Sequence, residues 1–475
     1  MKKLLCILLT MALLTGCAAP AVPTTEPPKT DGEVLIRLSD EGIEFPADSG
    51  VQTAEETDYT AVRITQPGTY RVSGKLSAGQ LAVDLGENAK DDPDATVLLI
   101  LDNADITCRT APAVIFCNVW ESGVANGLAG AHVLLANDSQ NRIVGACTED
   151  YDGAFYSRMS MKLDGTGSLW IEGGNEGLCS EMHLTINGGD ISISSGNDGI
   201  NTNADGVSVT TINDGRLWIA AGGEEGDGID SNGSVIINGG HIEAYACADS
   251  MDSGIDADLG IEINGGTVIA TGNMLDRIED GGQTFAVFSF AESQKVPWFT
   301  LKDMYASTVL EAQTPSAFTN LLFSCPELSE GTYTLWAGDT QFEGTTGSGG
   351  FFGQLQPIER PDFPGKGEGG DVEIPPQPTQ PIVTHGTVQP PAQGDRPADM
   401  PVVQLPEGSV GQMPVPPEPP EGAENMPVPE LPEGVEPPQN GIGRQPVQVI
   451  TGSLSTEFAV VEGANYFTNV RAITE

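Results

Sequence analysis

Short runs of alternating apolar and polar residues fill the middle of the chain and repeat at nearly constant spacing. A turn that follows one such strand recurs 25 or 26 residues apart, with its asparagine at Asn187, Asn213, Asn238 and Asn264. A second strand follows the turn, and a third begins at an acidic glycine step such as residues 198–200 or 227–229. Three short strands per period, without helical periodicity, predict an all-β fold: a right-handed parallel β-helix with three short strands per coil. The alternative, an antiparallel sandwich, predicts hairpin turns but no fixed repeat.

Composition changes at both ends of the repeat. Residues 1–16 have a basic start and an apolar stretch too short to span a bilayer, which indicates a lipoprotein signal peptide. The sequence before Cys17 resembles a bacterial lipobox, so we expect lipidation of Cys17 and a tether over residues 17–32. We expect a β-rich N-terminal cap at residues 33–90 and the parallel β-helix at residues 91–350.

Proline dominates the region after the predicted β-helix. Most of the 34 prolines of the chain lie between residues 351 and 450. Proline lacks a backbone donor, and the segment has no apolar period, so we predict a disordered, acidic, Pro/Gly-rich spacer there. Residues 451–475 read as C-terminal strands again, which predicts that the chain returns to the β-helix and that the spacer is an insertion.

The excess of acidic over basic residues restricts the partners that the chain can bind. The chain has 21 Lys and Arg against 67 Asp and Glu, a net charge of −46, which excludes a nucleic-acid partner. Few cations remain to pair with the carboxylates, so water, spacing or metal ions must accommodate them. The cysteines after the lipobox are scattered, and we interpret them as small buried hydrophobes rather than disulfides or a zinc site. They are Cys108, Cys117, Cys147, Cys179, Cys247 and Cys325.

Equivalent residues of successive coils stack about 4.8 Å apart, so the third strands predict columns of side chains. The inward column is Phe155, Leu178, Ile200, Ile229 and Ile255. Stacked carboxylates on the outward positions repel unless a cation intervenes, and Ca²⁺ takes carboxylate, amide and carbonyl oxygens. The candidate calcium ligands are Asp198, Asn201, Asp227, Asp230, Asp252, Asp256 and Asp258. A solvated acidic face without metal is the alternative.

The second strands predict an outward row of a different kind, with Trp170, Ser192, Trp218, Glu243 and Ile269 at equivalent positions. Trp170 and Trp218 lie two coils apart, roughly 10 Å, so exposed rings there can stack on alternate sugar rings. The candidate carbohydrate-binding residues are Trp170, Ser192, Trp218 and Glu243. The alternative is that the N-terminal cap or the C-terminal strands cover both rings. The asparagine column is assigned to structure, because stacked amides hydrogen-bond to one another.

Several segments together resemble one family, the bacterial secreted carbohydrate-binding domain-containing proteins with a polysaccharide-lyase-like parallel β-helix. The segments are residues 68–76, 101–106, 154–158, the asparagine and Asp-Gly-Ile repeats, and 458–470. The resemblance implies calcium binding and recognition of cellulose or acidic, pectin-type sugars, without a demonstrated catalytic apparatus. Arg158 and Ser253 depart from the family pattern, and Ser253 weakens the expected metal site in its coil.

Together, these observations predict a non-catalytic, monomeric polysaccharide-binding lipoprotein on the extracellular face of the bacterial cell membrane, held there only by its lipid anchor. A calcium-dependent polysaccharide lyase and a structural or adhesive surface protein remain alternatives. A lyase needs a base beside the acidic columns, for which Arg158, Lys162, Arg216, His183 and His241 are candidates. No Lys or Arg occurs between Asp227 and Asp258, which argues against a lyase.

Overall fold

The chain is all-β in the computed structural model, which describes residues 32–223, 225–347 and 453–473. Apart from one 3-10 turn at Ala89–Asp91, the regular elements in these ranges are strands. The signal peptide, Cys17, nearly all of the tether and the Pro/Gly-rich spacer lie outside the described residues. Within the ranges described, no helix has the length and hydropathy that crossing a membrane requires.

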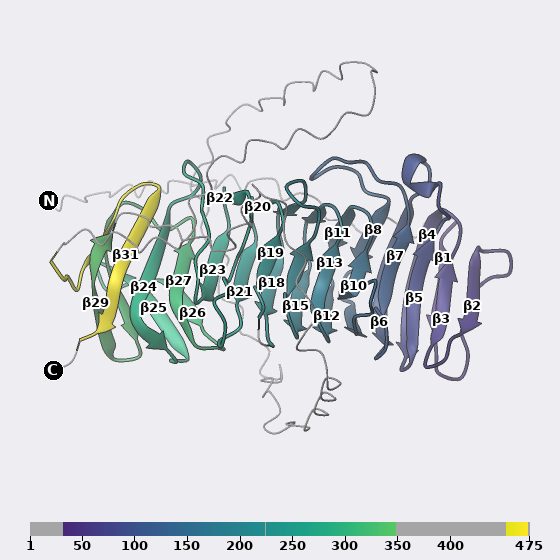
Figure 1. Cartoon of the computed structure of the whole chain (residues 1–475), viewed down its shortest axis with the longest axis horizontal. Coiled ribbons are helices and arrows are strands. Elements are labelled where there is room, and N and C mark those ends of the chain that lie inside the picture. The colour runs from purple at the N-terminus through teal and green to yellow at the C-terminus, as the bar shows by residue number, and fades with distance from the viewer. Residues whose placement is uncertain (1–31, 224, 348–452, 474–475) are drawn as a thin grey trace, which may run out of the picture. The chain divides into compact units, whose positions relative to one another are not determined.

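Three stacks of parallel strands carry the repeat (Figure 1). The first contains β11 (Met161–Gly165), β14 (Leu184–Ile186), β17 (Val209–Ile212), β20 (Ser234–Ile237) and β22 (Gly260–Ile263). The second contains β12 (Ser168–Gly173), β15 (Asp190–Ser195), β18 (Arg216–Ala220), β21 (His241–Tyr245) and β23 (Thr267–Gly272). The third contains β10 (Gly153–Ser157), β13 (Glu176–Ser180), β16 (Ile200–Thr202) and β19 (Ile229–Ser231). The predicted order of three strands per period is confirmed.

Residues 33–90, the region expected as an N-terminal cap, supply β1 to β5, and all of these except β2 extend the parallel stacks together with the strands of residues 97–145. One set is β1 (Val34–Leu38), β4 (Gly68–Leu76), β6 (Val97–Thr107), β8 (Ala131–Leu135) and β9 (Gln140–Gly145). The other is β3 (Thr60–Ile64), β5 (Gly79–Asp84) and β7 (Val114–Asn118), which leads into β10. Only β2 (Val51–Glu55) pairs antiparallel here, with β3, and it ends this sheet.

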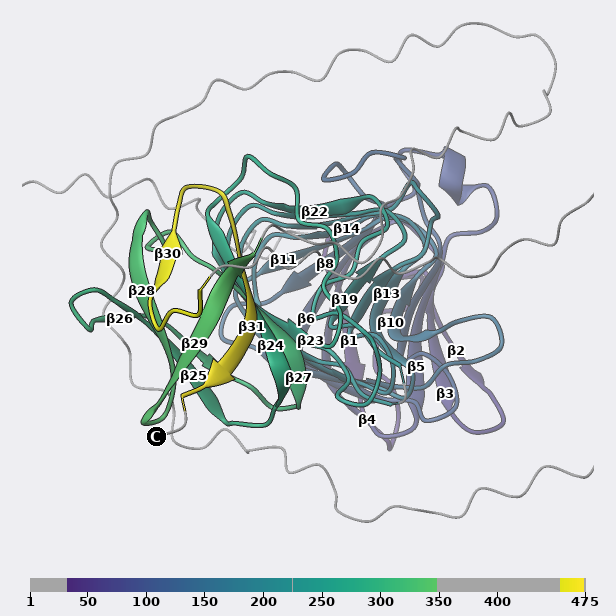
Figure 2. The ribbon, with the colours of Figure 1, turned by 60° about the vertical axis from the view of Figure 1, so that its left-hand side comes forward.

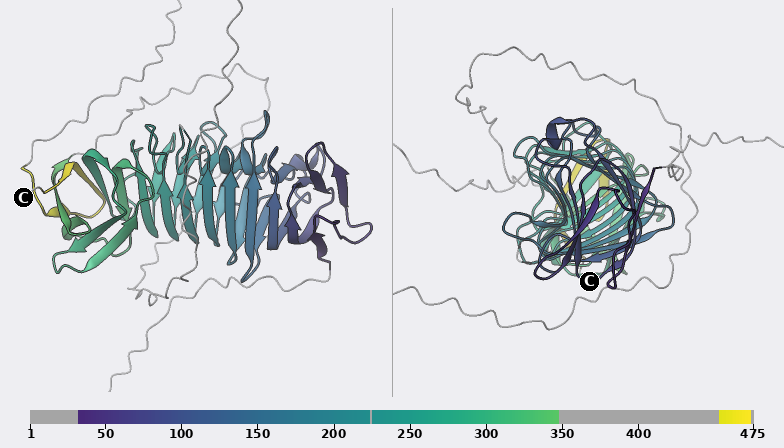
Figure 3. Two further views of the ribbon diagram at one scale, coloured as in Figure 1. Left: turned by 90° about the horizontal axis from the view of Figure 1, so that it is seen from below. Right: turned by 90° about the vertical axis from the view of Figure 1, so that its right-hand side faces the viewer.

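Strands that pair mostly antiparallel replace the parallel coils after β23, with β24 and β31 as a parallel pair, and we call them the C-terminal module (Figure 3). They are β24 (Phe285–Gln294), β25 (Trp298–Asp303), β26 (Thr308–Gln313), β27 (Phe318–Ser324), β28 (Gly331–Ala337), β29 (Thr340–Gly347), β30 (Phe458–Val460) and β31 (Ala464–Ala472). The last strand, β31, pairs with both β24 and β29 (Figure 2). The strands after residue 451 therefore pair with the C-terminal module.

The interior of the coils follows the predicted inward column. Phe155, Leu178, Ile200 and Ile229 are fully buried, and Ile255 is 3% exposed. Glycine precedes the isoleucines because the coils approach closely there. A Cβ at Gly199 would lie 2.1 Å from Cγ2 of Ile219 and 2.6 Å from the carbonyl oxygen of Gly228. The Asp-Gly-Ile step therefore places a carboxylate immediately beside a position that admits no side chain.

The turn asparagines form a continuous hydrogen-bonded ladder. Asn213 donates its side-chain amide to Asn187 (2.7 Å), Asn238 donates to Asn213 (2.8 Å), and Asn264 donates to Asn238 (3.0 Å). Asn187 in turn donates to Asp164 at 2.7 Å. Every amide thus points its donor at the preceding coil, which confirms the structural interpretation of this column.

The cysteines are free in the described part of the chain. Cys108, Cys179, Cys247 and Cys325 are buried, Cys117 is half-buried and Cys147 is exposed. Four of the six therefore occupy the small buried positions that we predicted for them.

Candidate functional site

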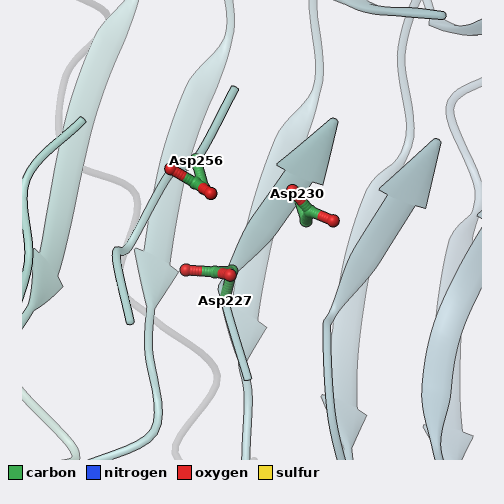
Figure 4. Close-up of side chains that lie close together, drawn as sticks. All are labelled: Asp227, Asp230 and Asp256. Carbon is green, nitrogen blue, oxygen red and sulfur yellow. The ribbon is translucent and has the colours of Figure 1, made fainter. Parts of the chain in front are cut away.

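Three carboxylates converge at the C-terminal end of the third stack. Asp230 lies on β19, Asp227 lies in the step just before it, and Asp256 follows the bridge between Ile229 and Ile255 in the next coil. One carboxylate oxygen from each lies within 4.8 Å of the other two, and all three side chains are half-buried (Figure 4). The predicted outward column thus brings Asp230 and Asp256 together, and the step adds Asp227.

Burial and mutual repulsion shift the pKa values of these carboxyls far upward. Burial is the main cause of a pKa of about 9 for Asp227, and the charge of Asp256 adds to it. Burial followed by the charges of Asp198 and Asp256 raises the pKa of Asp230 to about 8. For Asp256, burial and the neighbouring Asp276 raise the pKa to about 7. The strongest charges acting on all three groups are those of other carboxylates, which disfavour the ionised forms.

Backbone donors and buried oxygens complete the surroundings of the cluster. Asp227 accepts the backbone N–H of Ser253 at 2.6 Å, and Asp198 accepts the backbone N–H of Asp227 at 2.8 Å. The Ser253 hydroxyl oxygen and the Asn201 amide oxygen are buried without a hydrogen-bond partner among the described residues. Oxygen donors alone, with three carboxylates among them, match the preference of a hard divalent cation such as Ca²⁺.

A second acidic group lies one coil earlier. Asn201 donates its amide to Glu176 (2.8 Å) and to Asp198 (3.2 Å). Burial raises the pKa of Glu176 to about 7 and also raises that of Asp198. Asp198 and Asn201 therefore lie one coil before the cluster. The Asn201 amide donates a hydrogen bond to the Asp198 carboxylate.

The other two predicted ligands lie outside the cluster. Asp252 accepts the backbone N–H of Gly226 at 2.6 Å and also bonds to the Ser250 hydroxyl. Because Ile255 bridges to Ile229, Ser253 stands in this coil at the position that Asp227 has in the preceding coil. Burial raises the pKa of Asp258, whose column runs parallel to that of Asp256.

Sequence reasoning missed Asp276, which lies beyond the last repeat. Its carboxylate accepts the backbone N–H of Ala257 at 2.9 Å and hydrogen-bonds to Asp256. Burial raises the pKa of Asp276 as well. A coil alignment that stops at Ile255 gives no signal for this residue.

The second stack presents the predicted row in the predicted register. Trp170 pairs with Arg142 and Ser192, Ser192 pairs with Trp218, and Trp218 pairs with Glu243. We call Arg142, Trp170, Ser192, Trp218 and Glu243 the tryptophan row. Both indoles are half-buried rather than fully exposed. The guanidinium of Arg142 covers part of Trp170, and Trp218 packs beside Tyr245 with ring centroids 6.2 Å apart.

Glu243 ends the row in a network of hydrogen bonds. It contacts His241 (2.8 Å) and Arg216 (3.3 Å) through one oxygen, and accepts the Tyr245 hydroxyl (2.7 Å) with the other. Burial favours a higher pKa for Glu243, but the bonds from His241 and Tyr245 and the Arg216 charge outweigh it, so the pKa is lowered. Ile269 continues this row in register with Glu243, as predicted, but it is not exposed to solvent. It is 1% exposed, because β27 of the C-terminal module pairs with β23 and covers it.

Known proteins are similar to this part of the chain. A family model described as "Carbohydrate-binding domain-containing protein" matches residues 58–289. A "Carbohydrate-binding domain-containing protein" of Acetivibrio thermocellus is 30% identical over 196 residues, which cover 39% of this chain. The match spans 62% of that relative, less than two thirds of its length. The matched range of the family model contains the acidic cluster and the whole tryptophan row.

A solved structure described as the polysaccharide lyase-like protein from C. thermocellum, in a gadolinium derivative, is also similar. It shares 21% sequence identity and a TM-score of 0.38, over 49% of this chain and 89% of that chain.

Proposed function

We propose that this protein is a non-catalytic, calcium-dependent polysaccharide-binding protein whose coils form a right-handed parallel β-helix. The observation that carries the proposal is the cluster of Asp227, Asp230 and Asp256. Three half-buried carboxylates within 4.8 Å of one another form a site that a divalent cation would stabilise. The match to a carbohydrate-binding family over residues 58–289 supports the ligand class.

The net negative charge of the chain opposes the binding of an acidic sugar, so a cation is needed between them. At −46, the chain repels polygalacturonate over long range. Calcium held by Asp227, Asp230 and Asp256 would make the local potential positive, and a uronate carboxylate can serve as a further ligand. Asn201 and Ser253 offer unpartnered oxygens beside the same site.

Neutral sugars use the tryptophan row in this proposal. Stacking on Trp170 and Trp218 requires no charge, and Ser192 lies between the rings in register. Glu243 and Arg142 supply polar groups at the two ends of the row. Cellulose-type chains are therefore assigned to the row and pectin-type chains to the calcium.

A binding role is favoured over lyase chemistry by the positions of the basic side chains. Lys162 contacts Asp164 at 3.2 Å, while Arg216 and His241 contact Glu243. Arg158 is exposed and follows β10 directly. Its coil lies three coils before that of Asp230, which separates the two residues by roughly 14 Å at the spacing between neighbouring strands. His183 is only 5% exposed, so its imidazole is not accessible to a polymeric substrate. The lipid anchor at Cys17 places the binding function on the extracellular face of the membrane in this proposal.

Calorimetric titration of the full chain with Ca²⁺ tests the metal site. We expect binding at micromolar to millimolar affinity, which Mg²⁺ reproduces only weakly because of its stricter geometry. A chain that binds no Ca²⁺ in the millimolar range contradicts the proposal.

Sugar binding in EDTA separates the two ligand classes. We expect EDTA to abolish binding of polygalacturonate and to preserve binding of cellohexaose, with circular dichroism confirming that the fold persists. Acidic-sugar binding that survives in EDTA with the fold intact contradicts calcium bridging. Ultraviolet absorbance of a polygalacturonate and Ca²⁺ mixture stays constant for a binder and rises for a lyase, because β-elimination creates a conjugated double bond.

A further inference from the structure

The outer face of the C-terminal module carries two tryptophans on adjacent strands. β25 presents Trp298, Thr300 and Lys302 on one face, and β28 presents Thr334 and Trp336 on the same face. Trp336 pairs directly with Thr300, so Trp298 is its diagonal neighbour, about 7–8 Å away between Cα atoms. Trp298 is 42% exposed. A single extended ligand can therefore lie across both rings.

Local contacts hold Trp336 in place on this face. The ammonium of Lys302 lies 4.9 Å from the ring centroid of Trp336, and its indole N–H donates to Thr334 at 2.9 Å. The module's aromatic core lies on the opposite side of the sheet, where Phe299 and Leu335 are fully buried. The two tryptophans are thus surface residues whose burial contributes little to that core.

The other outward side chains on these strands are polar. Gln313 pairs with Trp298, Glu311 pairs with Thr300, and Gln341 pairs with Trp336. A protein interface core is enriched in apolar and aromatic residues together, whereas here the indoles have hydroxyls, amides and the charged Lys302 and Glu311 as neighbours. A second copy of this chain would bring a further charge of −46, which opposes self-association.

We propose that Trp298 and Trp336 form a second glycan-binding platform, specific for neutral β-linked polysaccharides. The indoles stack on the apolar faces of sugar rings, while Thr300, Thr334 and Gln313 hydrogen-bond to hydroxyls. The platform lies beyond residue 289, where the family model ends, and is separate from the acidic cluster and the tryptophan row. It therefore goes beyond the function proposed above and adds a second contact along one polymer, which raises avidity.

Fluorescence titration of the full chain with cellohexaose and xylohexaose tests this platform. The background carries Trp170→Ala and Trp218→Ala, which silence the tryptophan row, and EDTA removes any calcium contribution. We expect saturable binding of at least one hexasaccharide in this background. Adding Trp298→Ala should weaken it by about tenfold or more, whereas Trp336→Phe, which keeps an aromatic ring, should weaken it less.

Val461→Ala is the matched control, because Val461 is 53% exposed in the same module. We expect it to leave the affinity unchanged, and circular dichroism to show that each variant is folded. A background chain that binds neither sugar, or a Trp298→Ala change without effect, overturns the proposal. A concentration-dependent dimer in sedimentation velocity that Trp298→Ala abolishes also overturns it and assigns the face to a second copy. Because the row and the calcium site are silenced, this result is independent of the proposed function.

Discussion

The guanidinium carbon of Arg142 lies 4.6 Å from the centre of the Trp170 ring, on the neighbouring strand of the same row. Arg142 also contacts Asp105 (3.4 Å) and Thr107 (3.2 Å), which fix it over the indole. The cation thus lies over the indole, and Ser192 pairs with Trp170 on the strand to the other side.

Replacement of Trp170 should therefore separate binding from stability. We expect Trp170→Ala to reduce cellulose retention about tenfold while lowering the free energy of unfolding by no more than about 1 kcal/mol. Trp218→Ala should lower it by about 2 kcal/mol, because Trp218 packs on Tyr245 and the C-terminal module. Affinity electrophoresis and urea denaturation measure the two effects. Unfolding of the Trp170→Ala chain would show that this indole belongs to the core.

Neutralising one carboxylate of the cluster should remove most of the calcium affinity. Asp227→Asn deletes a charged ligand but preserves shape and an oxygen, so we expect about a hundredfold weaker Ca²⁺ binding by calorimetry. Asp214→Asn is the control, since Asp214 lies in an exposed turn whose carboxylate accepts the backbone N–H of Gly215. Equal calcium affinities in the two variants would place the metal elsewhere.

Stability of the calcium-free protein should depend on pH in an unusual direction. The folded-state pKa values of Asp256, Asp230 and Asp227 are about 7, 8 and 9, against an ordinary 3.8. A raised pKa means that the native state binds protons more tightly, so this stability is complete below about pH 4 and is lost as pH rises through 7 to 9. In EDTA, Tm should fall by about 5 °C or more between pH 5 and pH 9.

Calcium should cancel this trend, because bound cation stabilises the ionised carboxylates and binds more tightly as they deprotonate. Differential scanning calorimetry with and without Ca²⁺ compares the two curves. The Asp227→Asn/Asp230→Asn double variant should lose most of the slope in EDTA. A Tm in EDTA that stays constant from pH 5 to pH 9 contradicts the assignment of these pKa values.

The direction of the hydrogen bonds in the asparagine ladder leads to a further prediction. Asn213→Asp keeps the acceptor for Asn238 but loses the donor to Asn187 and places two oxygens against each other. We expect a loss of about 2 kcal/mol in the free energy of unfolding by urea titration. Asn264→Asp also removes one ladder bond, but Asn213 additionally donates to Asn126 (2.9 Å), so Asn264→Asp should cost less. Equal losses would indicate that the rungs are energetically independent.

The repeat made the register predictable, because one asparagine per coil defines the alignment of every other position. Trp170, Ser192 and Trp218 therefore lie side by side as the sequence predicts, and so do Asn201, Asp230 and Asp256. A register error of one residue would have moved each of them to the opposite face.

Features that depend on non-repeating segments were less predictable. Burial of Ile269 depends on β27, which has no counterpart in the coils, and Asp276 reaches Asp256 from beyond the last repeat. The strands of residues 33–90 stack as coils although they lack the asparagine turn. Periodicity identifies residues that share an environment, whereas ends and insertions create environments that occur only once.

The position of β31 makes the order of synthesis matter. This strand, the last regular element of the described chain, lies between β24 and β29, more than 100 residues earlier in the sequence. Until Ala464–Ala472 have been synthesised, β24 and β29 each keep an open edge, the kind of surface that recruits other strands. A chain truncated between Gly347 and Ala464 would present both edges permanently. Synthesis of β31 is therefore the step that closes this sheet and removes two edges that would otherwise favour aggregation.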